Sequence, residues 1–156
     1  MRAINHALTG ALIGLAVGEP SVAVPAAVAS HFVCDAIPHY DGLPARPTPL
    51  MKQRWIHSKL FKKLLVADAA LCLVLVAVLA DLEPAHWLLA AVCAFAAAAP
   101  DFLWIPRFLA RKAKPQKLTG FNKFAGGIQW FQRPIGAVVE VAWFIAAIIL
   151  IAPFLA

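Results

Sequence analysis

Long apolar stretches, separated by shorter polar ones, dominate the hydrophobic pattern of this chain. Apolar and polar residues do not alternate within these stretches as they do along the strands of a membrane barrel, so we expect helices. The pattern predicts helices joined alternately by short and long connections. The predicted helices span residues 4–17, 21–38, 57–81, 85–104 and 134–155.

Composition places these helices in a membrane. Hydrophobic residues make up 62% of the 156-residue chain and charged residues only 14%, whereas soluble domains contain about 45–50% and about 25%. We therefore expect an all-α integral membrane bundle of about five transmembrane helices, formed by one domain over residues 1–156. The first predicted helix carries Gly10, Gly14 and Gly18 at every fourth position, a stripe that lets another helix approach closely in a membrane.

The basic residues indicate an orientation. Arg2 lies at the start, and all other Lys and Arg residues lie in or beside the two long connections, 42–56 and 105–133. The short connections 18–21 and 81–86 contain none. Because basic loops stay on the cytoplasmic side, we expect the N-terminus and both long connections there, the C-terminus outside, and a location in a cell membrane such as the bacterial inner membrane.

Ionisable residues gather in the stretch 30–42, SHFVCDAIPHYDG, which follows an almost purely apolar run. Imidazoles and carboxylates there are costly unless they are paired or bind an ion. His31, Asp35 and His39 are spaced i, i+4, i+8, which predicts that they share one face of a helix. Pro38 is expected to kink or end that helix. Such a face suits Zn, Mn or Fe. The four residues are His31, Asp35, His39 and Asp41.

The other predicted helices bring further carboxylates and imidazoles to the same inner level. Lys59, Lys62 and Lys63 lie in the first turns of the helix predicted over 57–81, but no Lys or Arg lies deeper in the predicted spans to pair these residues. Several ionised acids at that level would repel one another. A bound dication would remove that repulsion; alternatively, some acids are protonated in an ion or proton pathway, or bond a neighbouring helix as neutral acids. These residues are His6, His57, Asp68, Asp101 and Glu140.

Two stretches, NHALTGALIGLA and SHFVCDAIPHYDG, resemble the membrane-bound metal-dependent hydrolases whose enteric member is regulated by LexA. The resemblance implies metal-dependent hydrolysis without naming a substrate. The family's HRGxTHS element reads QRWIHSK in this chain. The residues that match family positions are His6, His31 with Asp35, His57 with Ser58, and Pro100 with Asp101.

The expected function is therefore hydrolysis of a phosphate ester or phosphodiester on a membrane lipid, with a divalent metal, zinc, at the cytoplasmic membrane level. Metal-bound water supplies hydroxide at neutral pH. Asp68 and Glu140 are candidates for a general base or a bridging ligand. The basic connections would attract anionic lipid headgroups. The expected metal ligands are His6, His31, Asp35, His39, Asp41 and Asp101.

Two alternatives stay open. A small ion-binding or transporter-like protein would line a path with the same acids, but it would need polar groups through the whole membrane, and the outer halves of the later helices have none. A purely structural metal would hold the bundle together without chemistry. The chain contains no P-loop or nucleotide fingerprint, and no soluble nucleic-acid module, so we expect no nucleic-acid partner.

Overall fold

The computed structural model describes residues 1–40, 42, 49–104, 120–128 and 133–156. Within these ranges the chain is all-helical and contains no β-strand, as the sequence predicts. The elements are α1 (Ala3–Val17), α2 (Pro20–Ala36), α3 (Pro49–Ile56), α4 (Lys59–Leu82), α5 (Trp87–Ala98), η1 (Ala99–Trp104), α7 (Phe121–Ile128), α8 (Gly136–Ile151) and η2 (Ala152–Phe154).

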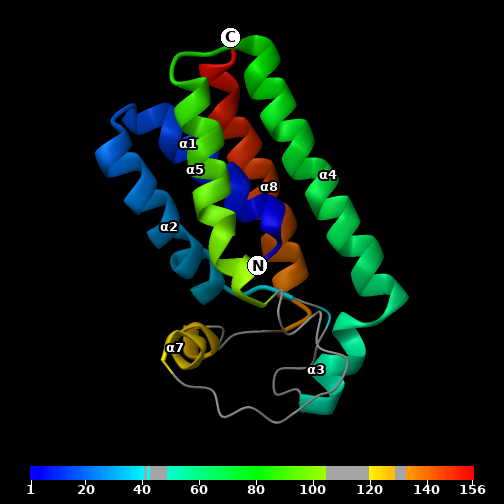
Figure 1. Ribbon diagram of the computed structural model, residues 1–156. Helices are drawn as coiled ribbons and strands as arrows, with labels where there is room; N and C mark the ends of the chain where they lie inside the picture. The colour runs from blue at the N-terminus through cyan, green and yellow to red at the C-terminus, as the bar shows by residue number, and fades with distance from the viewer. Residues whose placement is uncertain (41, 43–48, 105–119, 129–132) are drawn as a thin grey trace.

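The longer helices α1, α2, α4, α5 and α8 run alternately up and down one bundle (Figure 1). α1 is central, because it packs against each of the other four. The short helices α3 and α7 lie at the end of the bundle that holds the N-terminus, and the C-terminus lies at the opposite end (Figure 1). The two ends of the bundle therefore differ, and the beginnings of α1, α4 and α8 share one end with the ends of α2 and α5.

Glycines on α1 allow it to contact α5 at backbone distance. A Cβ on Gly10 would collide with the carbonyl of Cys93, and a Cβ on Gly14 would lie 2.5 Å from the Cα of Ala90. Gly18 ends α1 in the left-handed conformation, with φ of 68°, which glycine adopts without steric cost. The close approach predicted for this glycine stripe is confirmed, and the partner is α5.

Helix ends differ from the predicted ones for local reasons. α2 ends at Ala36 rather than at residue 38, because Ile37 precedes Pro38 and is extended, with ψ of 148°, as residues before proline tend to be. The helix predicted over 85–104 is α-helical only to Ala98 and continues as the 3₁₀ turn η1, which contains Pro100. Proline removes a backbone donor, so the tighter turn begins beside it.

The long connection 42–56 contains a helix that the sequence pattern does not predict. Residues from Pro49 to Ile56 form the helix α3. The prolines of this connection suggested a loop, but proline is well tolerated in the first turn of a helix, and Pro49 is the first residue of α3. The structure thus adds a short helix at the N-terminal end of the bundle.

Two helical segments are long and apolar enough to cross a membrane. They are Lys59–Leu82, with 24 residues, and Gly136–Phe154, with 19 residues. The apolar helices Ala3–Val17 and Trp87–Leu103 are shorter. α4 is largely exposed, since Leu79 is its only buried residue.

Candidate metal centre

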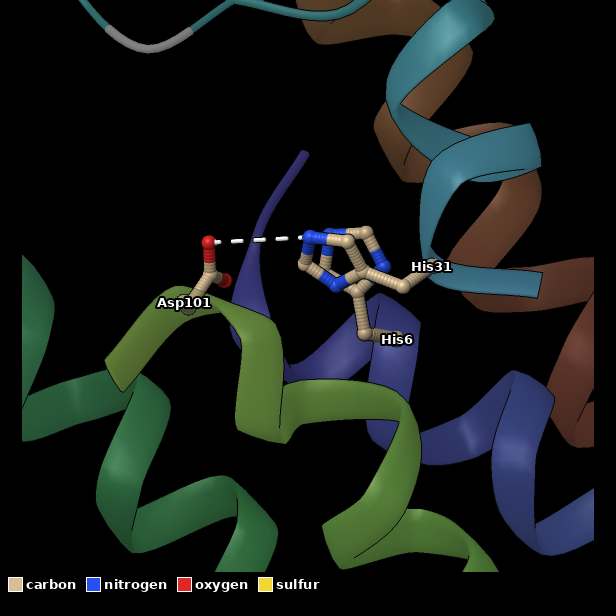
Figure 2. Close-up of side chains that lie close together, drawn as sticks. All are labelled: His6, His31 and Asp101. Carbon is tan, nitrogen blue, oxygen red and sulfur yellow. Dashed lines mark ion pairs between the residues drawn. The ribbon is translucent and has the colours of Figure 1, made fainter. Parts of the chain in front are cut away.

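His6, His31 and Asp101 come together from three different elements at the N-terminal end of the bundle (Figure 2). His6 lies on α1, His31 on α2 and Asp101 on η1. One potential ligand atom from each residue lies within 4.8 Å of those of the other two. This spacing is compatible with one metal ion bound by all three side chains.

A backbone carbonyl orients His31. Its Nδ1 lies 2.8 Å from the carbonyl oxygen of Ala97, in the last turn of α5. A carbonyl oxygen only accepts hydrogen bonds, so Nδ1 donates, and in the neutral ring Nε2 presents its lone pair. Hydrogen bonds of this kind fix the tautomer of metal-binding histidines.

The ring of His6 is completely buried and stacks on the ring of His31. The ring centroids are 4.1 Å apart, with an angle of 24° between the planes, and His6 has an exposed fraction of 0%. Neither ring nitrogen of His6 forms a hydrogen bond within the described part of the chain. Oδ1 of Asp35 lies 3.3 Å from Nε2 as an ion-pair contact, so Nδ1 is the ring atom without a polar partner among the described residues. A buried polar atom without a partner is costly.

Asp101 forms the accessible side of the cluster. Its Oδ1 lies 3.9 Å from Nε2 of His31, the pair joined by the dashed line in Figure 2. The side chain of Asp101 is 29% exposed, against 5% for that of His31. A small molecule would therefore reach the cluster from the Asp101 side.

Asp35 lies one turn after His31 on α2 and contacts both imidazoles. Its Oδ1 is 3.3 Å from Nε2 of His6, and its Oδ2 is 3.5 Å from Nε2 of His31. The α-amino group of Met1 also lies 2.6 Å from Oδ1. The i, i+4 arrangement predicted for His31 and Asp35 is confirmed, and both side chains face the bundle interior.

The hydrogen-bonding roles at His31 favour a cation at this place. Two carboxylates, Asp35 and Asp101, face the nitrogen that carries the lone pair in the neutral ring. Acceptors that face one another repel, and either a proton on Nε2 or a bound cation would make the arrangement favourable. Protonating both stacked rings would place two like charges about 4 Å apart, which costs free energy at that distance. The donor set of two imidazoles and one carboxylate matches that of catalytic zinc sites.

The predicted ligand His39 lies apart from the cluster of His6, His31 and Asp101. His39 follows the end of α2, is fully buried, and its Nδ1 contacts the carbonyl oxygen of Ile37 at 2.9 Å. It does not belong to the cluster around His6, because the helix ends before it and the i+8 position is lost. Its backbone instead lies against Gly136 at the start of α8. Asp41 lies outside the described residues.

Asp68 and Glu140 interact with Arg2 rather than with the histidines. Nη1 of Arg2 is 3.4 Å from Oδ2 of Asp68, and its Nε is 3.9 Å from Oε2 of Glu140. The expectation that these acids have no basic partner is therefore wrong. Arg2 lies outside the predicted spans, but it directly precedes α1. Its long side chain therefore reaches Asp68 on α4 and Glu140 on α8.

Glu140 also has a structural role. Its Oε1 accepts a hydrogen bond of 2.9 Å from the backbone N–H of Tyr40, and its backbone oxygen accepts one of 3.1 Å from Nδ2 of Asn5. These bonds connect α8 to α1 and to the segment after α2. Neither Asp68 nor Glu140 is part of the cluster of His6, His31 and Asp101.

His57 and the cysteines lie outside the cluster. His57 is exposed between α3 and α4. Cys34 and Cys93 are buried free thiols and Cys72 is a half-buried one. Sequence reasoning did not anticipate the role of Ala97, because a backbone carbonyl leaves no trace in the sequence.

Comparisons with protein families, curated proteins and solved structures found no match to this chain. The geometry of the cluster and the sequence motifs around it therefore carry the functional argument.

Proposed function

We propose that this protein is a membrane-embedded, metal-dependent hydrolase that acts on a phosphate ester or phosphodiester of a lipid. The observation that carries the proposal is the cluster of His6, His31 and Asp101, whose ligand atoms lie within 4.8 Å of one another. The resemblance of the surrounding motifs to membrane-bound metal-dependent hydrolases supports the same reaction class.

The surface of the bundle supports the membrane part of the proposal. Large apolar side chains face outward on α4 and α8, among them Leu73, 71% exposed, and Val138, 64% exposed. Apolar surface of this extent is rare on soluble monomers, and lipid chains would cover it. We propose about five transmembrane helices, with the shorter helices α1, α2 and α5 completing the bundle around the two long ones.

The residues fit a divalent metal, and zinc suits their chemistry. His6, His31 and Asp101 would hold it, with the carbonyl of Ala97 orienting one imidazole. Structural zinc sites are closed by four protein ligands, whereas catalytic sites have three and an open position. Three donors with an accessible side at Asp101 resemble the second kind.

The side chains around the cluster have separable roles in this proposal. A bound divalent metal would lower the pKa of its water and so supply a nucleophile near neutral pH. Asp35, within 3.5 Å of both imidazoles, is the carboxylate placed to accept a proton beside the cluster. We give it the role first considered for Asp68 and Glu140, since both of those interact with Arg2.

The transporter alternative has less support. The buried imidazole and carboxyl side chains among the described residues are His6, His31, Asp35, His39 and Glu140, and they lie toward the N-terminal end of the bundle. A transport path would need polar groups along its full length. A structural metal remains the competing account, because it requires the same three ligands.

Hydrolysis assays on purified protein separate these accounts. Hydrolysis is followed as release of inorganic phosphate from lipid phosphomonoesters and as release of the alcohol or phosphomonoester from lipid phosphodiesters. It should require a divalent metal, stop with chelator, and fall by about 100-fold or more in Asp101→Asn, because metal ligands contribute strongly to such reactions. His57→Ala is the matched control, since this histidine is exposed at the same end and lies outside the cluster. Metal binding without turnover of any phosphate ester would contradict the hydrolase proposal and favour a structural metal.

A further inference from the structure

α7 is set apart from the bundle helices by its direction. It lies at the N-terminal end of the bundle, and its axis runs across the bundle rather than along it, so that Figure 1 shows it end-on. If the bundle axis follows the membrane normal, α7 lies in the plane of the membrane surface. Short amphipathic helices with basic and aromatic residues bind membrane interfaces in this orientation.

An aromatic contact fixes α7 to α2 beside the candidate metal centre. The ring of Phe32 lies 5.8 Å from that of Phe121 and 5.5 Å from that of Phe124. Phe32 itself contacts the ring of His31 edge-on, with 5.2 Å between centroids. The side chain of Phe32 therefore lies between α7 and His31 of the candidate metal centre.

The rest of α7 presents an open apolar surface with one cation. A shallow hollow of about 530 Å³ lies along the helix. Although they pack on Phe32, Phe121 and Phe124 remain 43% and 56% exposed, and Lys123 is exposed next to them. The hollow is lined by Gly120, Lys123, Phe124, Gly127 and Ile128.

We propose that this surface of α7 binds an anionic phospholipid of the surrounding leaflet. The acyl part would contact Phe124 and Ile128, and the phosphate would pair with Lys123. Charge favours this partner, because the Lys and Arg residues that the structure describes lie just before α1, in α3, in the first two turns of α4, in α7 and just before α8, all at this end of the bundle. Each basic residue near a membrane surface favours anionic lipid. The inference rests on the membrane embedding in the proposed function, but not on its chemistry.

Fluorescence quenching by brominated lipids tests the proposal in nanodiscs. A bimane label is placed on Gly127→Cys, where a Cβ meets no atom within 4 Å, in a Cys72→Ala background, because Cys34 and Cys93 are buried. Brominated phosphatidylglycerol and brominated phosphatidylcholine are compared at equal mole fraction. The control label is on Val74→Cys, which is 57% exposed on α4 and reports embedding alone.

We expect both lipids to quench the Val74→Cys label equally. Phosphatidylglycerol should quench the Gly127→Cys label about two- to fivefold more than phosphatidylcholine, and Lys123→Gln should remove this preference. Equal quenching by the two lipids at Gly127→Cys, or none, overturns the proposal when the Val74→Cys label is quenched. Absence of quenching at Val74→Cys overturns the membrane embedding itself.

Discussion

His31 is oriented by a backbone carbonyl, and this single bond determines what its ring can do. With Nδ1 donating to the oxygen of Ala97, Nε2 faces Asp35 and Asp101 with its lone pair in the neutral state. The same side chain with the opposite tautomer could not bind a metal at this place. A metal-binding histidine thus depends on the path of α5 as much as on its own position in α2.

Arg2 shows how one long side chain changes the charge balance of the bundle. Its guanidinium lies between Asp68 on α4 and Glu140 on α8. These two carboxylates therefore need no metal to compensate them. Asp35 has a cationic partner as well, the α-amino group of Met1, so a metal would act at His6, His31 and Asp101 alone.

We predict that Arg2 and Asp68 stabilise the bundle cooperatively. Arg2→Gln and Asp68→Asn should each lower the melting temperature, and the double variant should lose less than the sum of the two. Because the contact is long and Arg2 is partly exposed, we expect a coupling free energy of about 1 kcal/mol. Thermal unfolding in detergent measures it.

Asp81→Asn supplies the control for this cycle, since Asp81 is exposed at the other end of α4. Its effect should add to that of Arg2→Gln without coupling. Strict additivity of Arg2→Gln with Asp68→Asn as well would show that the observed contact does not contribute to stability.

At the scale of elements, periodicity and apolar length were sufficient to predict the bundle helices. The sequence also placed His31 and Asp35 correctly, because i, i+4 spacing within one helix fixes their relative position. It failed at His39, where Pro38 ended the helix before the next turn. The partners of Asp68 and Glu140 could not be predicted, because they depend on where α1, α4 and α8 meet in space.

The contact of α1 with α5 gives a test of element packing. Gly10→Ala places a methyl group against the backbone of Cys93, so α1 and α5, which carry His6 and lead to Asp101, must move apart. We expect Gly10→Ala to lower the free energy of unfolding by about 2 kcal/mol, as other overpacked contacts do. Thermal or chemical unfolding in detergent measures the change.

Gly126→Ala is the matched variant on α7. It adds the same methyl group to a helical glycine, but into open space, and alanine favours helices over glycine. Its stability should stay equal to wild type or rise slightly. An equal loss of stability in both variants would contradict the packing argument.

At the scale of the whole molecule, the alternating helices place the ionisable cluster, α3 and α7 at the N-terminal end (Figure 1). The basic residues that the structure describes belong to segments at that end. Within the described ranges, two helical segments are long and apolar enough to span a membrane, and the apolar helices Ala3–Val17 and Trp87–Leu103 are shorter.

We predict that this end faces the cytoplasm, following the distribution of basic residues. In a Cys72→Ala background, an impermeant maleimide should label Ala85→Cys in intact cells. It should label Arg54→Cys only after the membrane is permeabilised. Both residues are exposed, at opposite ends of the bundle. Labelling of Arg54→Cys in intact cells would reverse the orientation.

The most direct test of the central claim is the metal content of the purified protein, measured by elemental analysis. We predict about one divalent ion per chain, with zinc as the metal, because two imidazoles and a carboxylate suit it. His31→Ala should lose the ion, whereas His57→Ala should retain it. Wild-type protein that carries no metal after loading with zinc, and whose melting temperature chelator leaves unchanged, would contradict the account.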